Sequence, residues 1–379
     1  MLLNDFDKAS YIPNMKHTFL ILLMAYCVSV MGCGKTSVSP SPPTIVGGVA
    51  ITTPVAKRRP ASIGLIGDSS NVVQPTNGGM VLMGGGTDVD AAFKWMIDKS
   101  GGGDVVILRA SGTDAYNPYI NGLGSVNSVE TLLINSKELA NNDTVAYIIR
   151  NAEMVFIAGG DQSDYMSYWK GTKTEKALNY LLNDKKAPVG GTSAGCAILG
   201  GFYYSGETGG LTSSQALANP YDSNVTLYNN DFLKAPYLQN VITDQHYLTR
   251  DRESRSVIFL GRINKDWKVA AKAIAADERT AVCIDKDGKA QVFGDFSTTR
   301  PYSYAYFIIS DGGKQPEQME ANKKAIWNNN EKALSVYEIP ASVNGGGNFN
   351  VANFNPTEAT GGKWYWWWID NGVLNKKDQ

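Results

Sequence analysis

The chain contains very little histidine. Only His17 and His246 occur among its 379 residues, and His17 lies beside a hydrophobic leader that we expect to be removed. His246 is therefore the only imidazole expected in the mature protein. One histidine and two separated cysteines do not make a metal-ligand cluster of the usual spacing. The sequence therefore predicts no bound metal.

Cysteine is also scarce, with four residues in the whole chain. Cys27 and Cys33 belong to the leader region, which leaves Cys196 and Cys283, both in apolar surroundings. One potential pair in a body of this size is not a disulfide framework. We therefore expect the fold to depend on its core and not on crosslinks.

A basic surplus is absent as well. The chain has 35 Lys and Arg residues against 36 Asp and Glu, a net charge of −1. No Lys/Arg-rich stripe runs along the sequence to contact a phosphate backbone. Nucleic acid is therefore not an expected partner.

The chain lacks an apolar run of the ~20 residues needed to cross a bilayer. Its N-terminal hydrophobic stretch, 19–26, follows Lys16 and is typical of the h-region of a signal peptide. The stretch ends at Val30-Met31-Gly32-Cys33, which resembles the lipobox of bacterial lipoproteins. The resemblance implies cleavage before Cys33 and lipid attachment to its thiol. An ordinary secretory signal is the alternative.

Residues 1–33 are thus expected to form a lipoprotein signal peptide, although Met15 is a more usual signal start than Met1. Residues 34–60 begin with a Ser/Pro-rich segment that cannot bury apolar area, and they are predicted to form a tether. We expect an exported protein, anchored by lipid to a bacterial membrane, in the periplasm or at the cell surface.

The remaining sequence is that of a globular protein, with 43% hydrophobic and 19% charged residues. From residue 79 onward, short apolar runs alternate with helix-like segments. Strands are expected at 80–83, 105–108, 131–134, 154–158 and 187–189, and helices at 88–99, 142–151 and 174–183. Alternation of this kind predicts an α/β fold with a doubly wound, mostly parallel sheet.

This catalytic domain is expected to span 61–310. Within it, the Asn/Gly/Ser-rich interval 206–230 is typical of a long loop or lid. The composition changes from about residue 311, and we treat 311–379 as a C-terminal extension rich in tryptophan.

Ser193 is the candidate nucleophile. It lies in Gly190-Gly191-Thr192-Ser193-Ala194-Gly195, between a predicted strand and an Ala/Ile/Leu-rich run. The G-x-S-x-G pattern is typical of a nucleophile elbow, in which small neighbours let the backbone turn sharply and push Oγ outward. A serine hydroxyl needs a base to take its proton, and a neutral imidazole is the usual one. His246, after a predicted strand at 241–243, is the available base.

A carboxylate should fix the tautomer of this imidazole. Glu278 lies at the end of a predicted strand. Asp244 is the rival, because residues two apart on a strand share a face. Backbone N–H groups should bind the oxyanion; Ala194 directly follows the nucleophile, and Gly160 or Gly159 can supply the second donor.

The order Ser193, His246, Glu278 argues against an α/β-hydrolase, in which the histidine comes last. Taken together, the residues resemble the cyanophycinase-like serine peptidases, a family that includes aspartyl dipeptidases. The matching blocks are 84–86, 158–162, 190–195, 244–246 with the arginines that follow, and 277–281.

The resemblance implies a flavodoxin-like, class I glutamine amidotransferase-like fold, with Ser193 as nucleophile, His246 as base and Glu278 as orienting acid. It also implies a substrate pocket. The residues expected to line it are Gln162, Asp244, Gln245, Arg250, Arg252 and Arg255. An arginine fork binds carboxylates bidentately, which suits an aspartyl group or a free terminus. For the three arginines, a solvated helix face is the alternative.

The expected activity is hydrolysis of aspartyl peptide bonds, with cyanophycin or related peptides as substrate. No cofactor is expected, because acyl transfer by these residues needs none. The alternative is a surface lipoprotein that binds peptide or glycan through the Trp-rich tail 364–368 on a retained hydrolase scaffold. The sequence leaves a homodimer open.

Overall fold

The computed structural model describes residues 59–295 and 303–379. The chain divides into two units, 1–55 and 56–379, and all described residues belong to the second. The predicted leader, Cys33 and the tether as far as residue 58 lie outside the described residues.

The first sheet has nine strands, and its centre is parallel. In spatial order the strands are β1 (Ser62–Gly67), β4 (Ser128–Leu133), β3 (Asp104–Arg109), β5 (Met154–Ile157), β6 (Val189–Thr192), β2 (Gly79–Met83), β11 (Thr280–Asp285), β12 (Lys289–Gly294) and β15 (Gly346–Asn350). The five strands from β4 to β2 run parallel to one another. The predicted parallel sheet is confirmed, and antiparallel strands extend it at both edges.

Helices cover both faces of this sheet. The helices of the described residues are α1 (Asp90–Lys99), α2 (Tyr116–Asn121), α3 (Lys137–Ala140), α4 (Asp143–Asn151), α5 (Gln162–Trp169), α6 (Lys173–Tyr180), α7 (Ala194–Ala197), α8 (Ser213–Ala218) and α9 (Glu253–Trp267), with a π-turn at Leu181–Lys185 and η2 (Pro356–Glu358). Neighbouring residues of β5 face opposite sides of the sheet. Phe156 belongs to the buried cluster that includes residues of α1, and Val155 belongs to the cluster that includes residues of α4 and α6. A strand buried on both faces has no polar side, which is why these strands read as continuous apolar runs.

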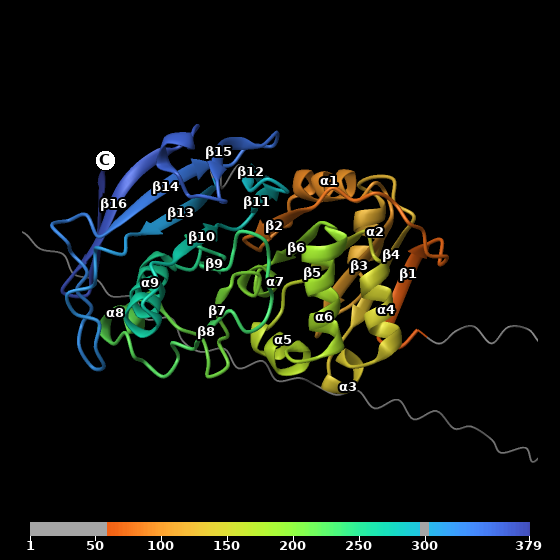
Figure 1. The fold of residues 1–379 in the computed structure, drawn as a ribbon, viewed down its shortest axis with the longest axis horizontal. Coiled ribbons are helices and arrows are strands. Elements are labelled where there is room, and N and C mark those ends of the chain that lie inside the picture. The colour runs from red at the N-terminus through yellow and green to blue at the C-terminus, as the bar shows by residue number, and fades with distance from the viewer. Residues whose placement is uncertain (1–58, 296–302) are drawn as a thin grey trace, which may run out of the picture. The chain divides into compact units, whose positions relative to one another are not determined.

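A second sheet of eight strands lies beside the first (Figure 1). Its order is β17 (Val373–Asp378), β16 (Lys363–Asp370), β14 (Leu334–Pro340), β13 (Tyr304–Ser310), β10 (Lys272–Ala276), β9 (Val241–Asp244), β7 (Phe202–Tyr204) and β8 (Leu227–Asn229). Only the β7–β9 and β9–β10 pairs are parallel. Helix α9 packs against one face and buries Val257, Phe259 and Leu260 there.

The expected C-terminal extension, 311–379, supplies β14, β16 and β17 to the second sheet and β15 to the first. The interval expected as a loop or lid, 206–230, contains α8 and β8 as well as loop. Among the helices of residues 59–295 and 303–379, none combines the length and hydropathy needed to cross a membrane.

Candidate active site

Ser193 occupies a sharp turn between β6 and α7. Its backbone has φ 52° and ψ −117°, a conformation that residues with a Cβ rarely adopt. The turn is tight, because a Cβ on Gly191 would lie 2.4 Å from the carbonyl carbon of Gly195. The small residues of the predicted elbow are therefore needed for close backbone approach, and Ser193 stays partly exposed.

His246 directs its imidazole at this serine. It follows β9 with φ 49°, and its backbone N–H donates to the Gly84 carbonyl at 2.7 Å. The ring lies against Gly85, where an added Cβ would come within 2.4 Å of His246 Cε1. Ser193 Oγ and His246 Nε2 are 2.8 Å apart. The glycines after β2 thus leave the space that the imidazole occupies.

Glu278 holds the other side of the ring. It lies in the short link between β10 of the second sheet and β11 of the first, and its Oε1 is 2.6 Å from His246 Nδ1. The side chains of His246 and Glu278 are 6% and 23% exposed. A carboxylate at Nδ1 favours the tautomer that leaves Nε2 free to accept a proton.

Asp244, the alternative acid, does not bind the imidazole of His246. Its carboxylate accepts from Arg255 at 2.5 and 3.1 Å and from Ser256 at 2.7 Å, all buried. The strand ends at Asp244, and the left-handed backbone of His246 breaks the alternation that would have placed both side chains on one face. Asp244 therefore fixes Arg255 beside the site.

The surroundings of His246 keep the imidazole neutral. Burial lowers its pKa below the usual 6.5, and the nearby Arg250 and Arg252 cations act in the same direction. Glu278 opposes this effect without reversing it. A neutral imidazole is the form that accepts a proton, so the ring is competent as a base at neutral pH.

The two predicted oxyanion donors lie on either side of the serine. Ala194 opens α7, where backbone N–H groups have no intrahelical acceptor. Gly160 follows β5, the strand next to β6. Within the described residues, no acceptor is found for the N–H of Ala194 or Gly160. Gly159 also comes close, since an added Cβ would lie 3.4 Å from Ser193 Cβ.

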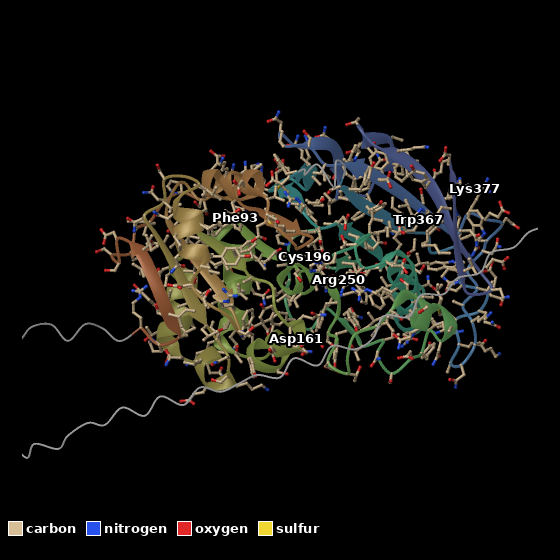
Figure 2. All side chains as sticks on the ribbon, turned by 180° about the vertical axis from the view of Figure 1, so that it is seen from behind. Phe93, Asp161, Cys196, Arg250, Trp367 and Lys377 are labelled. Carbon is tan, nitrogen blue, oxygen red and sulfur yellow. The ribbon has the colours of Figure 1, made fainter. Side chains whose placement is uncertain are left out.

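A pocket of about 530 Å³ adjoins Gly160. Four of the predicted substrate residues line it, namely Gln162, Arg250, Arg252 and Arg255. Arg255 is fixed by Asp244, and its guanidinium lies 5.2 Å from the Tyr204 ring centroid. Asp161 lines the same pocket as Arg250, and both residues are labelled in Figure 2.

The arginines differ in their partners. Arg252 donates to the backbone and side-chain oxygens of Gln245, and burial, together with the Arg255 charge, lowers its pKa to about 10. The exposed Arg250 side chain has no hydrogen-bond or ion-pair partner among the described residues. Arg250 is thus free to bind an anion. Gln245 is 4% exposed, does not line the pocket and instead positions Arg252.

Sequence reasoning missed part of the pocket wall. Tyr204, Leu211 and Thr212 line the pocket, and they come from β7 and from the predicted lid interval. Thr212 caps α8 through a capping box with Gln215. The T-x-x-Q spacing predicts the start of that helix. No local sequence pattern predicts that Tyr204 lines the pocket.

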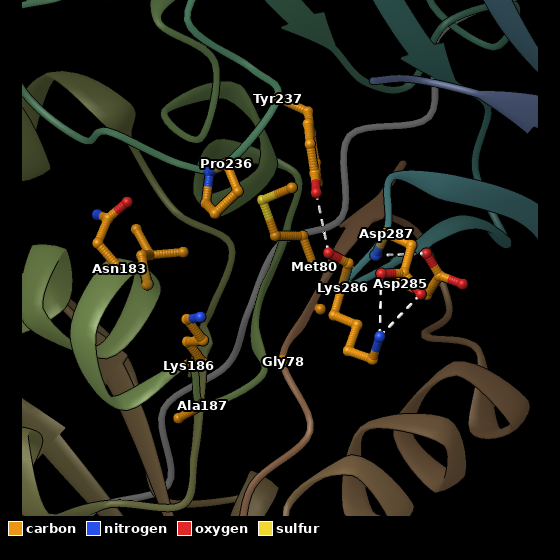
Figure 3. A pocket seen from close by; sticks show the side chains of 12 residues that line it. Gly78, Met80, Asn183, Lys186, Ala187, Pro236, Tyr237, Asp285, Lys286 and Asp287 are labelled. Carbon is orange, nitrogen blue, oxygen red and sulfur yellow. Dashed lines mark hydrogen bonds and ion pairs between the residues drawn. The ribbon is translucent and has the colours of Figure 1, made fainter. Parts of the chain in front are cut away.

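Another pocket, of about 330 Å³, lies at the opposite ends of the same strands (Figure 3). It is lined by Met80, Ala187 and Asp285, near the start of β2, before β6 and at the end of β11. Ser193 and His246 are not among its lining residues. In the described part of the chain, no group of three His, Cys, Asp or Glu residues is arranged to hold a metal.

Comparison with known proteins identifies the family. The model of peptidase family S51 matches residues 80–292, which is more than half of the chain. The chain belongs to peptidase family S51. The matched region contains Ser193, His246 and Glu278.

Several cyanophycinases with curated descriptions are similar to this chain. The chain is 26% identical to the cyanophycinase of Trichormus variabilis over 175 residues, 45% of the chain and 52% of that relative. It is 26% identical to the Synechococcus elongatus cyanophycinase over 200 residues, 52% of the chain and 57% of that relative. The matches span about half the length of each relative. A crystal structure of a peptidase from an acI-B1 Actinobacterium aligns over 61% of this chain and 91% of its own, with 17% identity and a TM-score of 0.43.

Proposed function

We propose that the protein is a serine peptidase of cyanophycinase type that hydrolyses aspartyl peptide bonds through an acyl-enzyme on Ser193. The observation that carries this proposal is the hydrogen-bond chain from Ser193 through His246 to Glu278. A nucleophile, a base and an orienting carboxylate within hydrogen-bond reach are the requirements for acyl transfer.

In the proposed reaction, Ser193 Oγ attacks the scissile carbonyl carbon while His246 Nε2 takes the hydroxyl proton. The N–H groups of Ala194 and Gly160 stabilise the negative oxygen of the tetrahedral intermediate. The imidazolium then gives its proton to the leaving amine, and the C–N bond breaks. Water, activated by His246, hydrolyses the resulting ester and regenerates Ser193.

The arginine pocket supports a carboxylate-bearing substrate. Three guanidinium groups line it, and the single Asp244 carboxylate pairs with two of them, bidentately with Arg255 and at 3.9 Å with Arg252. Three cations against one carboxylate leave the pocket positively charged, which favours an aspartyl carboxylate or a free C-terminus. The candidate substrates are cyanophycin, which would yield β-aspartyl-arginine, and small aspartyl peptides.

The direct experiment incubates the purified mature protein with cyanophycin and with α- and β-aspartyl dipeptides, and follows the products by mass spectrometry. Ser193→Ala is the control, because it removes only Oγ. Product release by the wild type alone supports the proposal. Release of the same products by the variant would contradict a role for Ser193.

A second candidate is a surface lipoprotein that binds peptide or glycan and does not turn it over. It is favoured by Trp364 and Trp366, which line a groove far along the chain from Ser193. A serine-directed phosphonate separates the two candidates, because only an activated Ser193 reacts with it. Inert Ser193, together with no turnover of any substrate, would favour the binding lipoprotein.

The location in the cell belongs to the same proposal. We propose export and lipid attachment at Cys33, supported by the lipobox-like sequence before it. Cys33→Ala should move the protein from the membrane fraction to the soluble fraction; an unchanged distribution would contradict the anchor. A homodimer remains a proposal that light scattering of the mature protein can test.

A further inference from the structure

A further cavity, separate from the two pockets described above, lies on the second sheet. It has a volume of about 690 Å³ and extends between η2 and the segment 311–314. We call it the tryptophan groove and define it by six of its lining residues: Lys272, Lys314, Ser335, Trp364, Trp366 and Gln379. None of them takes part in the site around Ser193.

The alternation of strand β16 presents tryptophan to this groove. Trp367, labelled in Figure 2, is 1% exposed and packs in the core beneath α9. Trp366 is the neighbour of Trp367, and Trp364 lies two residues before Trp366. Both point to the other face of the sheet and are only partly buried. Their rings therefore follow each other at roughly 7 Å along the strand.

Two lysines lie over the outer of these rings. The Nζ atoms of Lys314 and Lys332 are 4.7 and 5.8 Å from the Trp366 ring centroid. Neither lysine has a carboxylate partner among the described residues. Lys363 of β16 and Lys376 and Lys377 of β17 are all paired, with Asp378, Glu253 and Glu331 respectively. Lys314 and Lys332 thus differ from these three lysines in having no carboxylate partner within the described residues.

The groove offers hydrogen-bond donors beside one carboxylate, that of Asp311, which accepts from the Gly313 N–H and lies close to Lys272. The indole N–H groups of Trp364 and Trp366 have no acceptor within the described residues. Lys272 uses two of its three protons on the carbonyls of Ala270 and Ser310, both at 2.9 Å. A ligand that fits this lining offers flat apolar faces for the rings and acceptors for the donors, together with negative charge.

We propose that the tryptophan groove binds an oligosaccharide that carries carboxylate groups. The C–H faces of sugar rings pack on tryptophan, and uronic acid carboxylates match Lys314, which lines the groove, and Lys332, which lies over the Trp366 ring at its edge. A cationic polymer is disfavoured, because two ammonium groups already lie over Trp366 and would repel a guanidinium. A protein partner would need about 800 Å² on each side, whereas this groove has the size of a small-ligand site.

The test is calorimetric titration of the mature protein with oligogalacturonate, oligomannuronate, neutral maltohexaose and an α-linked polyaspartate peptide. We expect a uronate oligomer to bind more tightly than maltohexaose or polyaspartate. Trp366→Ala should weaken that binding roughly tenfold or more, and Lys314→Ala several-fold. Matched controls come from helix α1, which packs on the other sheet and in which Lys99 lies over Trp95 at 5.4 Å. Trp95→Ala and Lys99→Ala should leave binding unchanged.

Three results would overturn the proposal: no binding of either uronate, equal or tighter binding of polyaspartate, or unchanged binding by Trp366→Ala. Thermal unfolding of each variant identifies any folding defect, and Lys314→Ala tests the site if Trp366→Ala does not fold. The proposal is independent of the proposed peptidase activity. Ser193→Ala should bind uronate as the wild type does, so loss of hydrolysis and loss of oligosaccharide binding are separable.

Discussion

Replacing Glu278 by Gln tests whether this carboxylate orients His246. The substitution keeps the shape of the side chain but removes its charge. In the wild-type protein the carboxylate faces His246 Nδ1 at 2.6 Å, which holds the ring proton at Nδ1. A glutamine amide can instead donate its own N–H to Nδ1. The ring proton then sits on Nε2, which can no longer accept the proton of Ser193.

The expected size of the effect follows from this change of tautomer. Exchange of carboxylate for amide in a Ser-His-acid arrangement costs up to about 10⁴ in rate. Glu278 is 23% exposed, so water can compensate in part. We expect kcat/KM to fall by about 10² to 10⁴, equivalent to roughly 3 to 5 kcal/mol in the transition state.

The assay has two parts, because the natural substrate is itself under test. The first measures kcat/KM on whichever aspartyl peptide the wild type cleaves, and the second measures the rate at which a phosphonate labels Ser193. Glu138→Gln, an exposed change on α3, is the matched control and should behave as wild type. If Glu278→Gln labels within threefold of wild type while Ser193→Ala does not label at all, Glu278 does not orient the base.

Three further predictions concern the surroundings of His246. Arg250→Gln removes a cation that lowers the His246 pKa, so the pKa should rise in the variant. The acid limb of the pH profile of kcat/KM, expected below pH 6.5 in the wild type, should then move to higher pH. An unchanged or lower midpoint would contradict the electrostatic argument. Asp244→Asn removes the charge that pairs with the buried Arg255; the side chains of Asp244 and Arg255 are 3% and 4% exposed. The free energy of unfolding, measured with denaturant, should fall by about 3 to 5 kcal/mol. A loss below 1 kcal/mol would show that the pair is dispensable. Gly85→Ala places a Cβ 2.4 Å from the imidazole, and phosphonate labelling should slow by about 10² or more, with far-UV circular dichroism as the check that the variant still folds.

The parallel core was predictable because its signal is local. Strands buried on both faces are apolar throughout, and short turns separate them from the helices. The prediction of a helix over 174–183 was confirmed as far as Tyr180, after which the chain continues as a π-turn. No local pattern marked that change.

The second sheet was not predictable in the same way. Its strands β13, β14, β16 and β17 pair antiparallel within the C-terminal part, but β13 joins β10 and so continues the sheet that carries His246. Composition suggested a separate extension, because a pairing partner leaves no mark in a strand's own sequence.

The same limit applied to the third residue of the site. Residue types and spacing restricted the acid to Glu278 or Asp244. The choice depended on the left-handed backbone at His246, which is imposed by contacts with Gly84 and cannot be read from neighbouring residues. The role of Asp244 as the partner of Arg255 likewise requires the helix α9 to lie beside β9.

Ser193 follows a strand of the first sheet, His246 follows a strand of the second, and Glu278 lies on the link between them. The hydrogen-bond chain therefore depends on the position of one sheet relative to the other. A shift of about 1 Å between them would break the Oγ–Nε2 contact while the backbone pairing within each sheet stayed intact. The packing that opposes such a shift is shared, because one buried cluster holds Leu82 of the first sheet together with Ile274 and Phe307 of the second. Reactivity at Ser193 should accordingly be lost earlier on heating than secondary structure. Substitutions in β13 or β14, remote from the chemistry, can then alter turnover by changing the docking of the sheets.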